Sequence, residues 1–251
     1  NLYSKIKPNS NLTYLIKNGK LKPTITHDIG ELHPWSTWPT VHRGVNNNIH
    51  NIRFINQDLK CAEAWPPIWE TISLNDISIG IFGSLQSYPP IINKNVKFFL
   101  PDTFSPKEDC FPESLKNFQE FNLKISGKNK AIAKNFDLFD ILKFTKLIFK
   151  RQVNLKTFLK ILKHLVGEFI SKKNKLRRSL MQPIIGFDIY LKYMYKLNPQ
   201  FSTFFTNHVA GMMHRYWLDL FPLSENKVNK RSRFNRNSII KALDIADKQI
   251  G

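Results

Sequence analysis

The sequence predicts an α/β protein with a sheet at its centre. Residues 77–83 and 97–100 are short apolar segments rich in β-branched or aromatic side chains, as buried strands are. Residues 200–206 form a third such segment, far along the chain. Helical patterns lie before and between these segments, which is the arrangement expected of a sheet with crossover helices.

The remaining elements follow from apolar spacing and from stop signals. Residues 11–18 predict a helix that ends at Gly19, and residues 61–75 predict a second helix with prolines near its first turn. We expect residues 103–123 to be irregular because they contain several prolines. Further helices are predicted over residues 136–150, 155–169, 186–197 and 238–250, with a basic loop over 227–237.

The composition changes at residue 124. Residues 124–178 contain 16 Lys or Arg and only three acids, Asp137, Asp140 and Glu168. We therefore divide the chain into an N-terminal part of an α/β core (1–123), a basic helical insertion or cap (124–195) and a continuation of the core (196–251). The lysines of the 155–169 helix are expected on a solvated face, although a basic amphipathic helix can also lie on a membrane.

The net charge of +19 raises nucleic acid or an anionic membrane surface as partners. However, the chain has 29 Lys and only nine Arg, a bias that an AT-rich genome produces, whereas phosphate recognition favours Arg. We therefore do not expect nucleic acid, and we keep a membrane surface as an alternative partner. Two cysteines, no signal peptide and no long apolar run predict a soluble cytoplasmic protein.

Residues 33–52 gather hydroxyls, histidines and tryptophans in one segment that ends in an Asn-rich loop. Thr37 is the first candidate nucleophile, with Ser36 and Thr40 as alternatives, and a nearby metal or base would have to activate the hydroxyl. His33, His42 and His50 are candidate ligands or bases. In the simpler interpretation, the hydroxyls cap a helix that begins near Trp38.

A second polar cluster follows the last predicted strand, where open α/β sheets bind ligands. Asn207, His208 and His214 are candidate metal ligands, and Arg215 is a candidate for binding a phosphate or sulfate oxygen. On a helix, His208 and His214 would not share a face. The simpler interpretation is a polar loop that begins a helix.

Several segments resemble type I phosphodiesterases and nucleotide pyrophosphatases of the alkaline phosphatase superfamily. Residues 43–52 are similar to the family segment T-G-L-x-P-x-x-H-G-I, with Gly44, His50 and Ile52 matching directly. Residues 214–217 are similar to the end of a metal-ligand motif, QHxFW. Residues 11–19, 67–83 and 240–251 resemble other family elements in the right order.

The resemblance implies an alkaline-phosphatase-like sandwich, two metal ions, here zinc or manganese, and a Thr or Ser nucleophile that attacks phosphorus or sulfur. The sequence departs from the family in two places: the family's nucleophile falls on Pro34, and an Asp before the motif His falls on Ala210. Further family ligands would lie before Asn1 and after Gly251, which implies a fragment of the full domain.

Three functional hypotheses follow. The first is a metal-dependent phosphoester or sulfoester hydrolase that acts on a small anionic ester. The second is an inactive or truncated relative that binds an anionic ligand without hydrolysing it. The third is a nucleic-acid or membrane-surface binder that uses residues 124–178 and 227–236, and it predicts affinity that falls steeply with salt.

Overall fold

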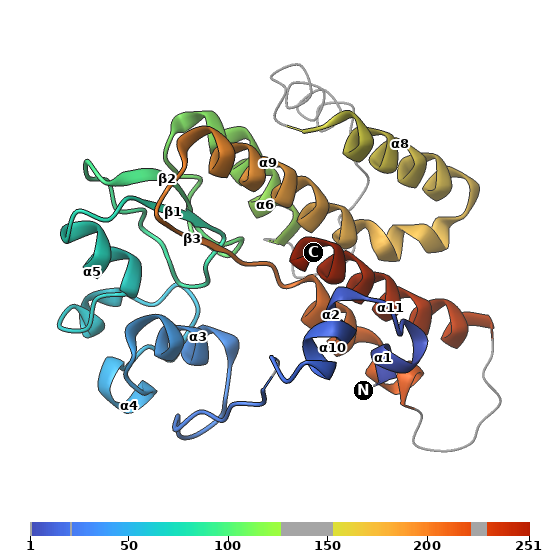
Figure 1. Ribbon diagram of the computed structural model, residues 1–251, viewed down its shortest axis with the longest axis horizontal. Coiled ribbons are helices and arrows are strands. Elements are labelled where there is room, and N and C mark those ends of the chain that lie inside the picture. The colour runs from blue at the N-terminus through green and yellow to red at the C-terminus, as the bar shows by residue number, and fades with distance from the viewer. Residues whose placement is uncertain (1, 21, 127–152, 222–229) are drawn as a thin grey trace.

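The computed structural model describes residues 2–20, 22–126, 153–221 and 230–251 (Figure 1). The described part is mixed α/β, with a small sheet of three parallel strands, β1 (Ile79–Phe82), β2 (Val96–Leu100) and β3 (Phe201–Phe204), in the order β2-β1-β3. In the central strand, Ile81 is paired with Phe99 on one side and with Thr203 on the other. The three strands predicted from the sequence are confirmed.

Helices cover both faces of this sheet. On one face, Phe82, Phe98 and Leu100 pack with residues of α6 (Lys116–Ser126), α8 (Leu155–Ile170) and α9 (Met181–Leu197). On the other face, Ile79, Ile81 and Phe99 pack with Trp69 of α5 (Ile68–Leu74). The residues assigned to a basic insertion therefore share a core with the sheet, because Ile161 and Ile185 belong to the first cluster.

A second body of helices packs beside the sheet (Figure 1). The long C-terminal helix α11 (Lys230–Ile250) lies against α10 (His208–Leu220), and the cluster between them includes Met212, Ile239 and Leu180. Leu180 ends the 3₁₀ helix η3 (Lys172–Leu180), which joins α8 to α9. This cluster connects the C-terminal helices to the element that follows α8.

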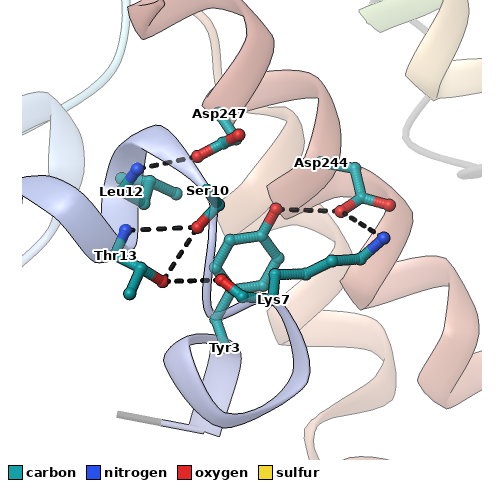
Figure 2. A network of polar contacts seen from close by, with 7 residues as sticks. All are labelled: Tyr3, Lys7, Ser10, Leu12, Thr13, Asp244 and Asp247. Carbon is teal, nitrogen blue, oxygen red and sulfur yellow. Dashed lines mark hydrogen bonds and ion pairs between the residues drawn. The ribbon is translucent and has the colours of Figure 1, made fainter.

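The two N-terminal helices, α1 (Leu2–Ile6) and α2 (Asn11–Lys17), are fastened to α11 (Figure 2). The Tyr3 hydroxyl donates to Asp244 Oδ1 at 2.8 Å, and the Leu12 amide donates to Asp247 Oδ1 at 2.7 Å. Ser10 caps α2 by accepting the Thr13 amide. The N-terminal segment is thus held by two carboxylates from the far end of the sequence.

The structure differs from the predicted helices where prolines are involved. Residues 61–75 are not one helix: Pro66 and Pro67 separate the 3₁₀ helix η1 (Leu59–Ala62) from α5. Residues 116–123, expected to be irregular, belong to α6, whose Phe118 and Asn122 are buried one turn apart. α9 begins five residues early, because Pro183 lies in its first turn, where backbone amides need no helical acceptor.

Other predicted segments are placed as follows. The helices at α2 and α8 are confirmed, and α11 extends the predicted 238–250 helix back to Lys230, so that residues 230–237 are helical and not a loop. The predicted helix over 136–150 and residues 227–229 lie outside the described residues. Among the described residues, no helix is both long and apolar enough to cross a membrane.

Candidate functional site

The helix α3 (Pro34–Arg43) carries the three candidate hydroxyls. It begins directly after His33 with a proline, whose fixed φ suits a first helical position, and it ends at Gly44, which has a φ of 70°. The short helix α4 (Asn47–His50) follows and packs against it. The tight turn at Gly44 therefore folds the histidine at position 50 back onto α3.

Thr40 lies between a carboxylate and an imidazole. Its Oγ1 is 2.7 Å from Asp28 Oδ1 and 3.0 Å from His50 Nε2. His50 is fully buried, and its Nδ1 accepts the amide hydrogen of Ile52 at 3.0 Å. Because burial lowers the pKa of His50, the ring is neutral near pH 7.

These contacts fix the direction of each hydrogen bond. Since Nδ1 of His50 is an acceptor, the single ring hydrogen is on Nε2, which donates to Thr40 Oγ1. The Thr40 hydroxyl then donates to Asp28 Oδ1. The carboxylate of Asp28, not the imidazole of His50, is thus the group placed to take the threonine proton.

Asp28 is held by α4. Its Oδ1 also accepts the Asn47 amide at 2.8 Å, while the Asn47 side chain exchanges two hydrogen bonds with the backbone of Ile29. Within the described residues, Asp28 Oδ2 is buried and has no hydrogen-bond partner. One oxygen of the Asp28 carboxylate therefore ties its loop to α4, and within the described residues the other oxygen is a hydrogen-bond acceptor without a donor.

The other two candidate hydroxyls have simpler surroundings. Thr37 Oγ1 donates to the His33 carbonyl at 3.1 Å, a contact within its own helix. Ser36 is buried, and its Oγ accepts from the Asn47 side chain at 3.3 Å. Of the three, only Thr40 contacts both a carboxylate and an imidazole, whereas Thr37 was preferred from the sequence.

A further acid lies at the carboxyl edge of the sheet. Asp102 follows β2 and is buried, and burial raises the pKa of its carboxyl group to about 6. Its two oxygens accept the backbone amides of Gln86 and Phe104, at 2.9 and 2.7 Å. Asp102 is not among the candidates from the sequence, although its place directly after a buried strand was an available signal.

Gln86 connects this edge to α3. Its side-chain amide donates to the backbone carbonyls of Phe54 and Trp35, at 2.7 and 3.3 Å. The ring of Trp38, also on α3, meets Phe205 edge-on after β3, with 4.9 Å between the ring centroids. The helix that carries the candidate hydroxyls is thus anchored at the carboxyl ends of β1 and β3.

A cavity of about 280 Å³ opens beside this edge. Its lining includes Arg43, the last residue of α3, together with Trp69 and Gln86. The Arg43 guanidinium donates to the backbone carbonyls of Ala62 and Trp65, and burial lowers its pKa. A cation is therefore held next to the cavity by backbone oxygens, without a neutralising ion pair among the described residues.

The predicted metal ligands do not come together. His208 is buried; its Nε2 donates to the Ala242 carbonyl and its Nδ1 lies 3.1 Å from Thr206 Oγ1, so both ring nitrogens are occupied. Asn207 and His214 are exposed, and His208 and His214 lie on different faces of α10, as helical spacing predicted. Within the described residues, no three His, Cys, Asp or Glu side chains are grouped to hold a metal ion.

Arg215, the predicted anion-binding residue, is exposed on α10. Its nearest recorded partner is Ser179 Oγ at 3.5 Å. In the described part of the chain, no contact connects Arg215 or His214 with the Thr40 network. The two segments singled out from the sequence come close at the ring contact between Trp38 and Phe205, but among the described residues their candidate polar side chains share no hydrogen bond.

No protein-family model, curated protein or solved structure matches this chain.

Proposed function

We propose that this protein hydrolyses small anionic esters, phosphoesters or sulfoesters, with Thr40 as the nucleophile. The observation that carries the proposal is the placement of Thr40 Oγ1 between Asp28 Oδ1 and His50 Nε2. A hydroxyl needs an adjacent base to become a nucleophile, and Asp28 is in hydrogen-bond reach of its proton. The resemblance of residues 43–52 to an alkaline-phosphatase-like segment supports the same class.

The chemistry assigns a role to each residue. Thr40 Oγ1 attacks phosphorus or sulfur while its proton passes to Asp28; the bond to the ester oxygen breaks, and the released alkoxide takes up a proton from solvent and leaves as the alcohol. His50 Nε2–H keeps the threonine oxygen in place through a hydrogen bond. After Asp28 has released its proton to solvent, water attacks the phosphorus or sulfur and gives a proton to Asp28; the bond to Thr40 Oγ1 breaks, and the proton on Asp28 returns to the threonine oxygen. The positive charge of the chain attracts the anionic substrate.

The two metal ions implied by the resemblance do not fit the residues proposed to hold them. His208 has no free ring nitrogen, Asn207 is the exposed residue just before α10, and His214 is exposed within α10. The residue roles therefore rest on Thr40, Asp28 and His50, and assays with zinc, manganese or EDTA decide whether a metal is required.

The test is hydrolysis of bis-p-nitrophenyl phosphate, p-nitrophenyl phosphate and p-nitrophenyl sulfate, each with zinc, manganese or EDTA. We expect Thr40→Ala to lower kcat/KM by at least about a thousandfold, because the nucleophile is lost. Thr40→Ser keeps a hydroxyl and should retain part of the rate, and Asp28→Asn should lower kcat.

Thr37→Ala is the matched control, because Thr37 lies one turn before Thr40 and bonds only within its helix. Equal loss in Thr37→Ala and Thr40→Ala would contradict the assignment of Thr40. Turnover that depends on a metal and disappears in His214→Ala would restore the site predicted from the sequence.

A second candidate function is binding of an anionic ligand without hydrolysis. It is favoured by the contacts of Asp28. Because its Oδ1 also accepts the Asn47 amide, the carboxylate has a structural role that does not require it to act as a base. It predicts no turnover of any of the three esters, together with measurable binding of inorganic phosphate or sulfate by calorimetry.

A further inference from the structure

The outer face of α8 is an exposed apolar stripe. From Leu155 to Phe169 its side chains recur at alternating spacings of four and three residues, which places them on one side of the helix, and Ile170 follows directly. Phe169 is 97% exposed and Ile170 is 81% exposed at the end of the helix. The complete stripe is Leu155, Leu159, Leu162, Val166, Phe169 and Ile170.

The opposite side of α8 is already used by the fold. Ile161 packs in the main core, and Glu168 is buried in an ion pair with Arg178 of η3. Among the described elements, α8 has its main contacts with η3 and α9, and Figure 1 shows it at the edge of the molecule. The apolar stripe therefore faces away from the rest of the described structure.

A row of lysines borders this stripe. Lys156, Lys160 and Lys163 are exposed at spacings of four and three residues, on one side of the apolar side chains. Two more exposed lysines, Lys172 and Lys173, follow the exposed end of the helix. The exposed half of α8 thus consists of an apolar stripe and a purely basic row.

We propose that α8 docks on an anionic lipid surface. An interfacial helix inserts its apolar side chains at the boundary between headgroups and acyl chains, while lysines contact the anionic headgroups. The same spacing would also suit a coiled coil between two copies. However, the only acid in α8 is the buried Glu168, so two copies would bring lysine rows together without acidic partners.

The test is flotation of the protein with vesicles of phosphatidylcholine alone and of equal parts phosphatidylcholine and phosphatidylglycerol. We expect binding to the anionic vesicles only, and its loss on raising the salt concentration. Lys156→Gln, Lys160→Gln and Lys163→Gln together should lower the partition coefficient by about a hundredfold. Leu159→Ser with Phe169→Ser should lower it by at least about tenfold.

The net charge of +19 makes matched controls essential. Lys5→Gln, Lys20→Gln and Lys22→Gln remove the same charge from exposed positions elsewhere, and Ile25→Ser with Leu74→Ser removes similarly exposed apolar side chains. These variants should bind as the parent does, and circular dichroism should report the same melting temperature for all.

Three results would overturn the proposal. The first is failure to bind anionic vesicles. The second is equal loss in the control variants, which would mean attraction by net charge alone. The third is a dimer in sedimentation that Phe169→Ser dissociates, which would assign the stripe to a second copy. None of these measurements depends on ester hydrolysis.

Discussion

At the residue scale, His208 shows how burial changes what a histidine can do. Burial lowers its pKa to about 4, and it lowers the pKa of His42, which contacts Trp38 and Trp69, by a similar amount. Both rings are therefore neutral at pH 7. Residues that looked like ligands or bases in the sequence are packing groups.

The lowered pKa values of His42 and His208 make the free energy of unfolding depend on pH. A histidine whose pKa is lower in the folded chain than the usual value near 6.5 binds its proton more readily after unfolding. The stability that depends on neutral His42 and His208 is complete above about pH 6.5 and is lost as the pH falls toward 4. We expect the urea midpoint to decrease over this interval, and His208→Gln to flatten the decrease.

The loss in the free energy of unfolding is at most about 3.5 kcal/mol for each histidine, because a shift from 6.5 to about 4 is multiplied by about 1.4 kcal/mol per pKa unit. His214→Gln is the control, because His214 is exposed on the same helix. An identical pH profile for the parent and His208→Gln would contradict a buried, neutral His208.

At the scale of an element, the packing of β1 depends on a glycine in its interior, Gly80. A Cβ at Gly80 would lie 2.3 Å from the ring of Phe98, so the aromatic side chain occupies the space that any other residue would need. Phe98 contributes to the core with α9 through this close approach. Gly80 lowers the intrinsic strand propensity of β1, but its missing side chain leaves the space in which the ring of Phe98 packs over the strand.

We expect Gly80→Ala to destabilise the protein by about 1–3 kcal/mol or more, because the core must move to relieve the overlap. Gly211→Ala is a matched control: Gly211 lies in α10, and nothing is within 4 Å of its added Cβ. That substitution should be neutral or stabilise by up to about 1 kcal/mol. Urea unfolding of both variants checks the pair, and equal stabilities would contradict the close packing at Phe98.

Helices and strands were predictable where the residue types and spacing within the segment itself determine the structure. The strands at 79–82 and 96–100 follow from short segments rich in β-branched or aromatic side chains, and α8 follows from its spacing. The helix α6 was missed because its burial of Phe118 and Asn122 depends on tertiary partners, while the prolines before it suggested a loop. The general α/β class was therefore predictable, but the alkaline-phosphatase-like sandwich stays a hypothesis.

At the scale of the whole molecule, the candidate site depends on contacts that no local pattern specifies. Asp28 was not among the candidates, because an isolated acid in a loop before α3 has no motif. Asp28 becomes a candidate base only in the folded chain. The turn at Gly44 brings the Asn47 amide to Asp28 and brings His50 to Thr40, which donates to Asp28. From the sequence, residues 33–52 were the candidate segment and Thr37 the preferred hydroxyl; the contacts that favour Thr40 exist only in the folded chain.

The attachment of α1 and α2 to α11 is testable at the same scale. Asp244→Ala with Asp247→Ala removes the acceptors of Tyr3 and of the Leu12 amide, so the N-terminal helices should open more often (Figure 2). We expect faster tryptic cleavage after Lys5 in α1 and Lys17 in α2. Asp76→Ala, which breaks an exposed ion pair with Lys94, is the control, and equal cleavage in both variants would contradict this attachment.

The same attachment sets an order of events during synthesis. Tyr3 and Asp244 are separated by 241 positions, so α1 and α2 leave the ribosome long before their acceptors are translated. Among the described elements, the main contacts of α1 and α2 are with each other and with α11, so until then they depend mostly on local contacts, which are weak for segments of such length. We infer that the N-terminal segment is the last to fold on the nascent chain, and that a chain stalled before α11 exposes it to proteases and chaperones.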